Sequence, residues 1–233
     1  MTPVIELLKG TKEYRGIPAV KDVTFTLNPG EVHALLGENG AGKSTLTKML
    51  AGVVEPTYGE VRIDGKKVEL KTPSEALRSG IAMVYQETSL IPSLTVAQNL
   101  YLTDDKQIHR LRGIYIAGQQ FLQSLNFHVD PTAMVSSLGA GQKQMVEIAR
   151  AVHHKARVII FDEPTSTLTP EEKYQFFSLI DRLQKQGVSI IFISHALEEA
   201  LQISDRITIM RDGEHVITDK TSNFDRDKII SAM

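Results

Sequence analysis

A glycine-rich segment that ends in lysine and serine is the first part of this chain with a clear chemical meaning. Residues 37–44 read G-E-N-G-A-G-K-S and fit the pattern G-x-x-x-x-G-K-[ST]. The segment follows an apolar run at 32–36 and precedes a helix-forming run at 45–50, so it is expected to turn from a strand into a helix. In such a turn the backbone N–H groups point inward, and the helix N-terminus adds free donors and a partial positive charge. The segment therefore predicts a cradle for a polyphosphate.

The residue types of this phosphate loop predict how a nucleoside triphosphate and its metal are held. Lys43 is expected to reach the β and γ phosphates, and the hydroxyl of Ser44 is expected to bind Mg²⁺. The residues that we expect to line the nucleotide are Gly37, Asn39, Gly40, Ala41, Gly42, Lys43, Ser44 and Thr45. A glycine-rich turn with a chance lysine is the alternative, and the flanking strand and helix argue against it.

An acidic pair supplies the metal ligand and the base that triphosphate hydrolysis needs. Residues 158–164 read V-I-I-F-D-E-P, the Walker B pattern, so an apolar strand ends in Asp162 and Glu163. A carboxylate at the carboxyl end of a parallel strand faces the crevice where such sheets bind ligands, so Asp162 is expected to hold Mg²⁺ directly or through water. Glu163 is then placed to polarise the attacking water. The alternative is an acidic strand end that only leads into a turn at Pro164.

Both motifs need a mostly parallel sheet, and short β-rich runs alternate with longer helical stretches along the chain. Buried strands are expected where the sequence is apolar and rich in β-branched residues, at 32–36, 81–85, 158–161 and 188–193. Residues 23–27 alternate apolar and polar side chains, as a half-buried strand does. Two Asp-Gly turns predict hairpins that pair 60–63 with 68–70 and 207–210 with 215–218. Residues 95–155 predict a helical insert that starts with a capping box of Thr95 and Gln98.

Length and composition are those of an ordinary globular protein. The chain has 233 residues, of which 42% are hydrophobic and 23% charged, and these values exclude disorder, collagen and coiled coil as descriptions of the whole. Its apolar runs are far shorter than the roughly 18 residues of a membrane span. A net charge of −2 predicts no general attraction to nucleic acid. The chain has no cysteine and begins without a secretion-signal pattern, so we expect a cytosolic location.

The order of the remaining motifs makes the chain resemble the ATP-binding subunit of an ABC transporter. Gln86 follows a predicted strand, an L-G-A-G-Q segment at 138–142 precedes a helical run, and His195 follows another strand. Tyr14 comes before the first long predicted strand, and S-T-L-T at 166–169 stands where the family has its D-loop. The stretches most similar to monosaccharide importers of the ribose and galactose type are M-V-Y-Q-E at 83–87, Q-M-V-E-I-A-R-A at 144–151 and D-E-P-T-S at 162–166.

The resemblance implies a P-loop ABC ATPase cassette of the α/β class: a mostly parallel sheet core, an antiparallel β subdomain and a helical insert. It implies one domain over 1–233, with a core formed by 1–94 and 156–233 and a helical subdomain at 95–155. Two cassettes would close head to tail on two ATP molecules, the second being another copy or part of a tandem chain. The other implied partners are transmembrane permease subunits and, indirectly, a solute-binding protein, but not nucleic acid. The cassette would then sit on the inner face of the cell membrane.

The resemblance also implies roles for single residues. Tyr14 would stack on adenine, and the alternative is that its ring packs under a hairpin. Gln86 would sense Mg²⁺ and the attacking water, and the segment 87–102 after it would meet the permease, although this segment also fits a surface helix. His195 would bond the γ-phosphate, while a lone histidine is more often structural. Gly139, Gly141 and Gln142, in the signature segment 138–142, would grip the γ-phosphate of the opposite site through a helix N-terminus.

The signature departs from the family pattern at two positions. Gly139 stands where the family has a serine that contacts the γ-phosphate, and Ala140 stands where it has a glycine. Loss of a hydrogen bond to a charged group is worth about 1.5 to 3 kcal/mol. The main hypothesis is an ATPase that drives solute import, most similar to sugar import, and the alternative is a regulatory nucleotide-binding cassette with weak turnover of its own. The chain would be the first half of a longer protein or a free-standing subunit.

Overall fold

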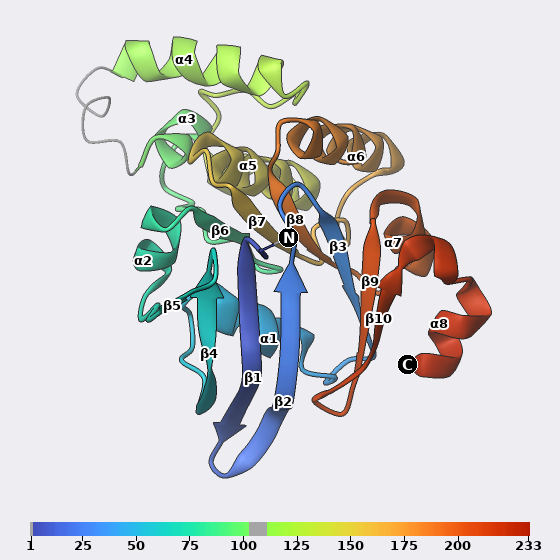
Figure 1. Ribbon diagram of the computed structural model, residues 1–233. Helices are drawn as coiled ribbons and strands as arrows, with labels where there is room; N and C mark the ends of the chain where they lie inside the picture. The colour runs from blue at the N-terminus through green and yellow to red at the C-terminus, as the bar shows by residue number, and fades with distance from the viewer. Residues whose placement is uncertain (1, 103–110) are drawn as a thin grey trace. The chain divides into compact units, whose positions relative to one another are not determined.

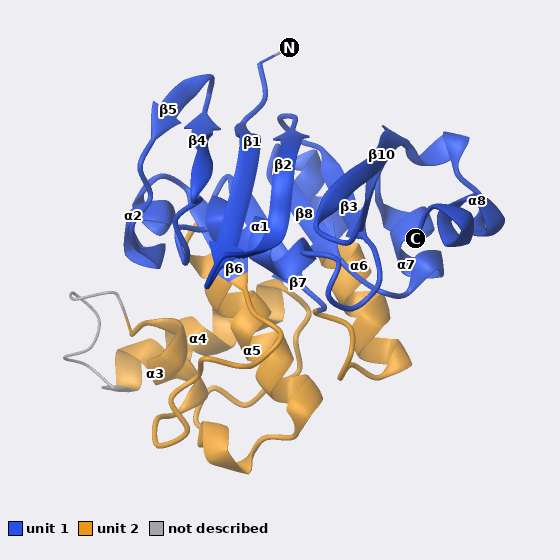
Figure 2. Cartoon of the chain, turned by 90° about the horizontal axis from the view of Figure 1, so that it is seen from below, with its two compact units in different colours: residues 1–83, 156–163, 180–233 blue, residues 84–155, 164–179 orange. Residues whose placement is uncertain are grey.

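The computed structural model describes residues 2–102 and 111–233 (Figure 1), and they form two compact units (Figure 2). The first unit contains residues 1–83, 156–163 and 180–233, and the second contains 84–155 and 164–179. The chain changes unit four times: within strand β6, Ile81–Val84, after Lys155, after Glu163, and within helix α6, Pro170–Lys185. Among the described residues, no helix combines the length and the apolar character that a membrane crossing requires.

The first unit is built on a six-stranded sheet with the order β10-β9-β3-β8-β7-β6. Its strands besides β6 are β3 Val32–Leu36, β7 Val158–Asp162, β8 Ser189–Ile193, β9 Arg206–Arg211 and β10 Glu214–Lys220. β3 pairs in parallel with β8 and β9, β7 pairs in parallel with β8, and only the β9–β10 hairpin is antiparallel among these pairs of described strands. Every residue of β3, β7 and β8 is buried, as expected of parallel strands covered on both faces. The four predicted strands and the predicted mixed α/β fold are confirmed, and only β6, at the edge of the sheet, contains a half-buried residue, Met83.

A four-stranded antiparallel sheet, with the order β2-β1-β4-β5, belongs to the same unit. Its strands are β1 Ile5–Tyr14, β2 Ile17–Leu27, β4 Tyr58–Ile63 and β5 Lys66–Val68. The Asp-Gly turn predicted for the first hairpin is confirmed, because Asp64 and Gly65, between β4 and β5, both have the positive φ of a type I′ turn. The predicted second strand at 68–70 is wrong, since a two-residue turn lets β5 begin directly at Lys66. The sequence does not predict strand β1. Tyr14 is the last residue of β1, whereas the sequence places it before the first long strand.

Two apolar clusters hold the first unit together. The larger one packs helix α1, Lys43–Leu50, against both sheets, and it includes Leu7, Phe25, Leu46 and Ile160. The smaller one includes Ala34, Leu36 and Phe224 under helices α7, Leu197–Ile203, and α8, Arg226–Ala232. Because neighbouring side chains of β3 point to opposite faces, Leu35 joins the larger cluster while Ala34 and Leu36 join the smaller one. The remaining short helices of this unit are α2, Pro73–Arg78, and η2, Thr221–Asn223.

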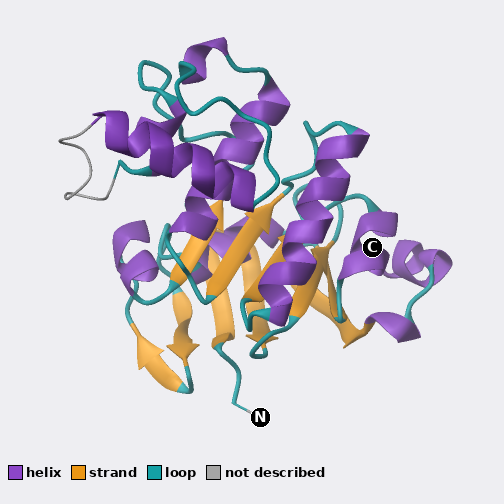
Figure 3. Cartoon of the chain, turned by 90° about the horizontal axis from the view of Figure 1, so that it is seen from above, coloured by secondary structure: helices purple, strands orange, loops and turns teal. Residues whose placement is uncertain are grey.

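In the described part of the second unit, the named elements are helices apart from the last residue of β6, and loops connect them (Figure 3). Its helices besides α6 are α3 Val96–Leu100, α4 Leu111–Ser124, η1 Val135–Ser137 and α5 Ala140–His153. The predicted capping box is confirmed: the Thr95 hydroxyl accepts from the Gln98 amide at 3.3 Å, and the Gln98 side chain accepts from the Thr95 amide at 2.8 Å. The ring of His153 packs edge-on between Tyr101 and Phe121, so this histidine belongs to an aromatic cluster and is not a plain surface residue.

Candidate functional site

The phosphate loop connects β3 to α1, as its sequence predicts, and close backbone packing fixes its shape. Gly37 has φ of 151°, and a Cβ there would lie 2.3 Å from the carbonyl oxygen of Met210. Gly42 has φ of 94°, and a Cβ there would lie 2.6 Å from the carbonyl oxygen of Ala19. Both approaches are closer than any side chain tolerates, so only glycine lets the loop pass these backbones.

Helix α1 presents an N-terminus suited to an anion. Its N-cap residue is Gly42, which has no side chain to cap the first-turn N–H groups, and the first turn contains no acidic residue. The helix dipole therefore adds to the free donors at this end. Lys43 begins the helix with a side chain that is only 6% exposed, and its Nζ donates to the carbonyl oxygens of Gly37 at 2.8 Å and Glu38 at 3.0 Å.

The charge of Lys43 is held close to two carboxylates. Burial lowers the pKa of the Lys43 amine, while the negative charges of Glu163 and Asp162 act in the opposite direction. The amine lies inside the loop, where two carbonyl oxygens accept its hydrogen bonds. A phosphate oxygen is a stronger acceptor than the two carbonyls that Lys43 now contacts, because it carries charge.

Asp162 ends β7 beside the phosphate loop, where the sequence predicts a metal ligand. Its side chain is 5% exposed, and its Oδ1 accepts a hydrogen bond of 3.4 Å from the Ser44 hydroxyl. Burial raises the pKa of Asp162, the hydrogen bond from Ser44 lowers it, and the charge of Glu163 raises it again. A hydroxyl and a carboxylate are oxygen ligands of the kind that Mg²⁺ takes in nucleotide sites. The donors present here therefore fit the expected ion.

Glu163 has an unusual backbone conformation. It has φ of 49°, in the left-handed region that residues other than glycine rarely adopt, and its N–H donates to the carbonyl of Ile193 at 3.1 Å. Its Oε2 lies 3.5 Å from Nδ1 of His195. The side chain of Glu163 is 15% exposed and that of His195 is 63% exposed. The strained turn thus directs one protected carboxylate toward a histidine that solvent and ligands can reach.

Buried bonds hold the backbone beside His195 in place. Ser194 is buried, and its hydroxyl donates to Oε2 of Glu199 at 3.3 Å while accepting from the N–H of Ala196 at 3.0 Å. The chain turns from β8 into α7 at this point. Because Ser194 is anchored on both sides, the exposed ring of His195 projects from a fixed backbone.

Tyr14 lies at the end of β1 with 45% of its surface exposed. The Nζ of Lys12 is 5.6 Å from the centre of the ring and donates to the carbonyl of Glu55 at 2.7 Å. A ring exposed to this extent is not packed under a hairpin. Its free face can stack on a flat heterocycle, as the family resemblance implies.

The other predicted site residues belong to the second unit. Gln86 is exposed and follows β6 by two residues. Gly139 is the N-cap of α5, and its N–H donates to the side chain of Gln142 at 3.3 Å. Helix α5 starts at Ala140, three residues before the helical run that the sequence indicates. The signature residues Gly141 and Gln142 thus occupy the first turn of a helix whose first turn contains no acidic residue of its own.

One acidic residue from another helix approaches this turn, and sequence reasoning did not identify it. A Cβ on Gly141 would lie 2.5 Å from Oε2 of Glu172, so the glycine leaves room for that carboxylate. Glu172 Oε2 also accepts from the N–H of Thr169 at 2.9 Å, and the Thr169 hydroxyl accepts from the N–H of Glu172 at 3.2 Å. The sequence contains the signal for this arrangement, because Thr169 and Glu172 have the spacing of a capping box.

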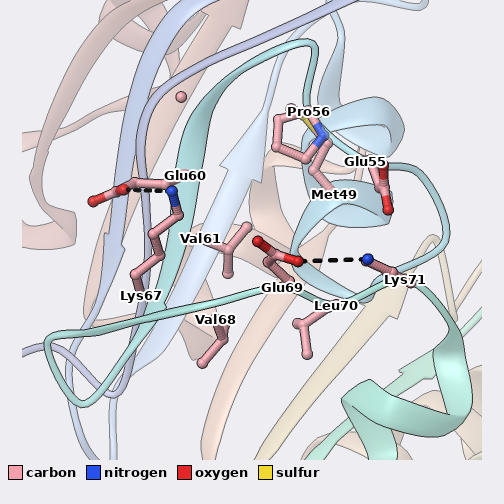
Figure 4. A pocket seen from close by; sticks show the side chains of 11 residues that line it. Met49, Glu55, Pro56, Glu60, Val61, Lys67, Val68, Glu69, Leu70 and Lys71 are labelled. Atoms are coloured by element: carbon pink, nitrogen blue, oxygen red, sulfur yellow. Dashed lines mark ion pairs between the residues drawn. The ribbon is translucent and has the colours of Figure 1, made fainter.

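A pocket of about 290 Å³ lies at the opposite end of α1 from the phosphate loop (Figure 4). Met49 and the β4–β5 hairpin line it. Its lysines are paired with acidic neighbours: Lys67 lies 3.5 Å from Glu60, and Lys71 lies 3.5 Å from Glu69. Since these positive charges are already compensated, the pocket does not offer the cationic surroundings that a triphosphate needs.

The structure therefore brings the phosphate loop, Ser44, Asp162, Glu163 and His195 together in the first unit. Gln86 and the signature segment lie in the second unit.

Comparisons with known proteins agree with this geometry. A protein-family model described as ABC transporter matches residues 20–166. The chain is 44% identical over 238 residues to a ribose import ATP-binding protein of Rubrobacter xylanophilus, an alignment that covers 100% of this chain and 47% of that protein. It is 43% identical to a galactose/methyl galactoside import ATP-binding protein of Clostridium perfringens, covering 99% of this chain and 45% of that protein. The chain thus spans about half the length of the curated relatives it matches.

A solved structure shows the same fold. It is a dimeric ATP-binding cassette in a post-hydrolysis state, bound to ADP and phosphate. Its TM-score with this chain is 0.84 at 26% sequence identity, and the match covers 94% of this chain and 100% of that cassette. The predicted similarity to sugar importers and the predicted cassette fold are both confirmed.

Proposed function

The chain belongs to the ABC transporter family, and we propose that it binds MgATP and hydrolyses it to drive solute import through separate membrane subunits. The observation that carries this proposal is the cluster formed by the uncapped N-terminus of α1, the buried cation of Lys43, and the paired oxygens of Ser44 and Asp162. These groups match the charge of a triphosphate and the ligand preference of its metal.

We propose that binding begins at the phosphate loop. Lys43 exchanges its contacts with the carbonyls of Gly37 and Glu38 for contacts with β and γ phosphate oxygens. Ser44 and Asp162 would hold Mg²⁺, which would supply positive charge to neutralise the phosphate oxygens. Gly37, Asn39, Gly40, Ala41, Gly42 and Thr45 line the phosphates, and Tyr14 stacks on the adenine ring.

In the hydrolytic step, Glu163 orients and polarises the attacking water with a carboxylate fixed by its strained backbone. His195 donates a hydrogen bond to the γ-phosphate. It lies within 3.5 Å of Glu163, and this spacing supports a shared site for the two side chains. Gln86 would sense Mg²⁺ and the attacking water through its amide, as the family resemblance implies.

We propose that the first unit is the nucleotide-binding core and the second is the helical subdomain. The free N–H groups at the start of α5, with Gly139, Gly141 and Gln142, contact the γ-phosphate bound to a second cassette. The dimeric cassette bound to ADP and phosphate supports this arrangement by its similarity. The second cassette is another copy of this chain or a further part of a longer protein.

The relatives that import ribose and galactose support sugars as the solute class, with membrane permeases as direct partners and a solute-binding protein as an indirect one. The protein then works on the cytoplasmic face of the membrane. The same relatives favour a transport ATPase over a regulatory cassette.

Removal of the loop cation tests this proposal. Lys43→Ala removes a charged donor for the β and γ phosphates, so the affinity for MgATP should fall at least about tenfold. Isothermal titration of MgATP into both proteins measures the effect, and Lys66→Ala, in the exposed β4–β5 hairpin, is the matched control with unchanged affinity. Equal affinities of Lys43→Ala and the unmodified protein would overturn the assignment.

A further inference from the structure

A buried carboxylate in the second unit links α5 to the loop that carries Gln86. Glu147 lies on α5, is 3% exposed, and its Oε1 accepts hydrogen bonds from both the N–H and the hydroxyl of Ser89, the hydroxyl bond measuring 3.0 Å. Its Oε2 accepts from Arg150 at 2.6 Å, and Arg150 also donates to the Ser89 hydroxyl. The carboxylate is thus satisfied by donors from its own helix and from the loop.

The strength of this cluster follows from its burial and charge. A buried carboxylate is costly unless it is paired and hydrogen-bonded, and here Arg150 supplies the opposite charge. Hydrogen bonds to an ionised group are about twice as strong as those between neutral groups. The loop at Ser89 is therefore tied to α5, although residues 86–89 are exposed.

Glu147 holds the chain shortly after Gln86. It accepts two hydrogen bonds from Ser89, three residues later. Tyr85 comes directly before Gln86, and its pKa is raised by burial and, to a smaller extent, by the charge of Glu147. The bonds to Ser89 limit the positions that the backbone at Gln86 can take.

The same helix carries the signature at its start. Glu147 follows Ala140, the first residue of α5, by seven positions, which is about two turns or 10 Å along the axis. The signature end of α5 and the Gln86 loop are therefore parts of one connected body within this unit.

We propose that Glu147, supported by Arg150, is a positioning residue that holds Gln86 in the place where it contributes to ATP hydrolysis. This proposal rests on the proposed ATPase function. Glu147 itself touches neither nucleotide nor metal, and its effect on turnover passes through Gln86.

A double-mutant cycle of ATPase rates tests the proposal. Glu147→Ala should lower kcat roughly tenfold in the unmodified protein, because a misplaced catalytic group loses much of its effect. In a Gln86→Ala background the same change should lower kcat less than twofold, since the group that it positions is gone. Equal fold-losses in both backgrounds would show that Glu147 acts elsewhere and would overturn the proposal.

A milder variant keeps the test decisive if Glu147→Ala fails to fold. Ser89→Ala removes only the hydroxyl of an exposed residue, and its smaller loss in kcat should likewise disappear in the Gln86→Ala background. Additive losses for this variant also contradict the proposal. Glu198→Gln, which breaks an exposed ion pair with Arg226 in the first unit, is the control and should leave kcat unchanged in both backgrounds.

A measurement without nucleotide separates this proposal from the proposed function. The chain contains no tryptophan, so Thr88→Trp places a single fluorescent reporter on the exposed loop. Adding Glu147→Gln should lower the fluorescence anisotropy of the reporter and increase its quenching by acrylamide. An unchanged signal would overturn the positioning role even if Lys43→Ala abolishes ATP binding as expected.

Discussion

Gly139→Ser is the substitution that tests the signature most informatively. Gly139 has φ of −67° and ψ of 165°, a conformation open to serine, and a Cβ at this position meets nothing within 4 Å. At an N-cap, serine stabilises a helix by only a few tenths of a kcal/mol more than glycine does, so the substitution should change the stability of the fold very little.

The expected effect on turnover is much larger. If the new hydroxyl bonds the γ-phosphate of the opposite site more strongly in the transition state, a hydrogen bond to a charged group contributes about 1.5 to 3 kcal/mol. That range corresponds to about a 10- to 150-fold increase in kcat. Gly139→Ala is the matched control, because it adds the same Cβ without the hydroxyl.

Steady-state ATPase rates at saturating MgATP, measured over a range of protein concentrations, provide the assay. A site shared by two cassettes should gain activity as the protein associates, and the serine variant should gain most. Equal rates for the serine and alanine variants, with both proteins folded, would refute the argument that the missing hydroxyl limits turnover.

Two further predictions concern the acidic pair. Glu163→Gln should leave MgATP affinity nearly unchanged while lowering kcat by about 10²- to 10⁴-fold, the usual contribution of a general base. Isothermal titration measures the affinity, and an ATPase assay measures kcat. Turnover at the rate of the unmodified protein would exclude Glu163 as the base. Burial raises the pKa of Asp162 above 3.8, so between 3.8 and that raised value the folded protein binds more protons than the unfolded chain, and stability falls as pH rises through this window. Asp162→Asn should therefore increase the free energy of unfolding at pH 7 without magnesium, and this gain should vanish at a pH below 3.8, the ordinary pKa of the carboxyl group. Urea denaturation at pH 7 and below pH 3.8 measures the effect. A variant that is less stable than the unmodified protein at pH 7 contradicts the prediction.

The sequence predicts the parallel core well because its strands are buried on both faces. The run 158–161 is apolar throughout, and 188–193 is apolar except for Ser189, so both leave little choice of structure. Strand β1 escapes detection for the opposite reason. Its pairing with β2 shifts register between Leu7 and Gly10, and Lys9 has φ of 47°, so the alternation that marks a half-buried strand is interrupted.

The candidate site likewise contains residues that the sequence identifies and contacts that it does not. The residues of the phosphate loop follow one another in the sequence, and so do the two residues of the acidic pair, so each group is identified by its own motif. The contact of Glu147 with Ser89 joins residues 58 positions apart, and neither residue has a local pattern that indicates its partner. Helix α5 begins at Ala140 although Gly141 is a poor helix former, because the Gln142 side chain accepts a hydrogen bond from the backbone N–H of Gly139 and caps this end.

The most direct test of the central claim is a crystal structure of this protein with magnesium and a nonhydrolysable ATP analogue. The account predicts that Nζ of Lys43 leaves the carbonyls of Gly37 and Glu38 for phosphate oxygens, with the metal bound to the Ser44 hydroxyl and Asp162 beside it. A triphosphate bound away from the start of α1, or a metal far from Ser44, would contradict it.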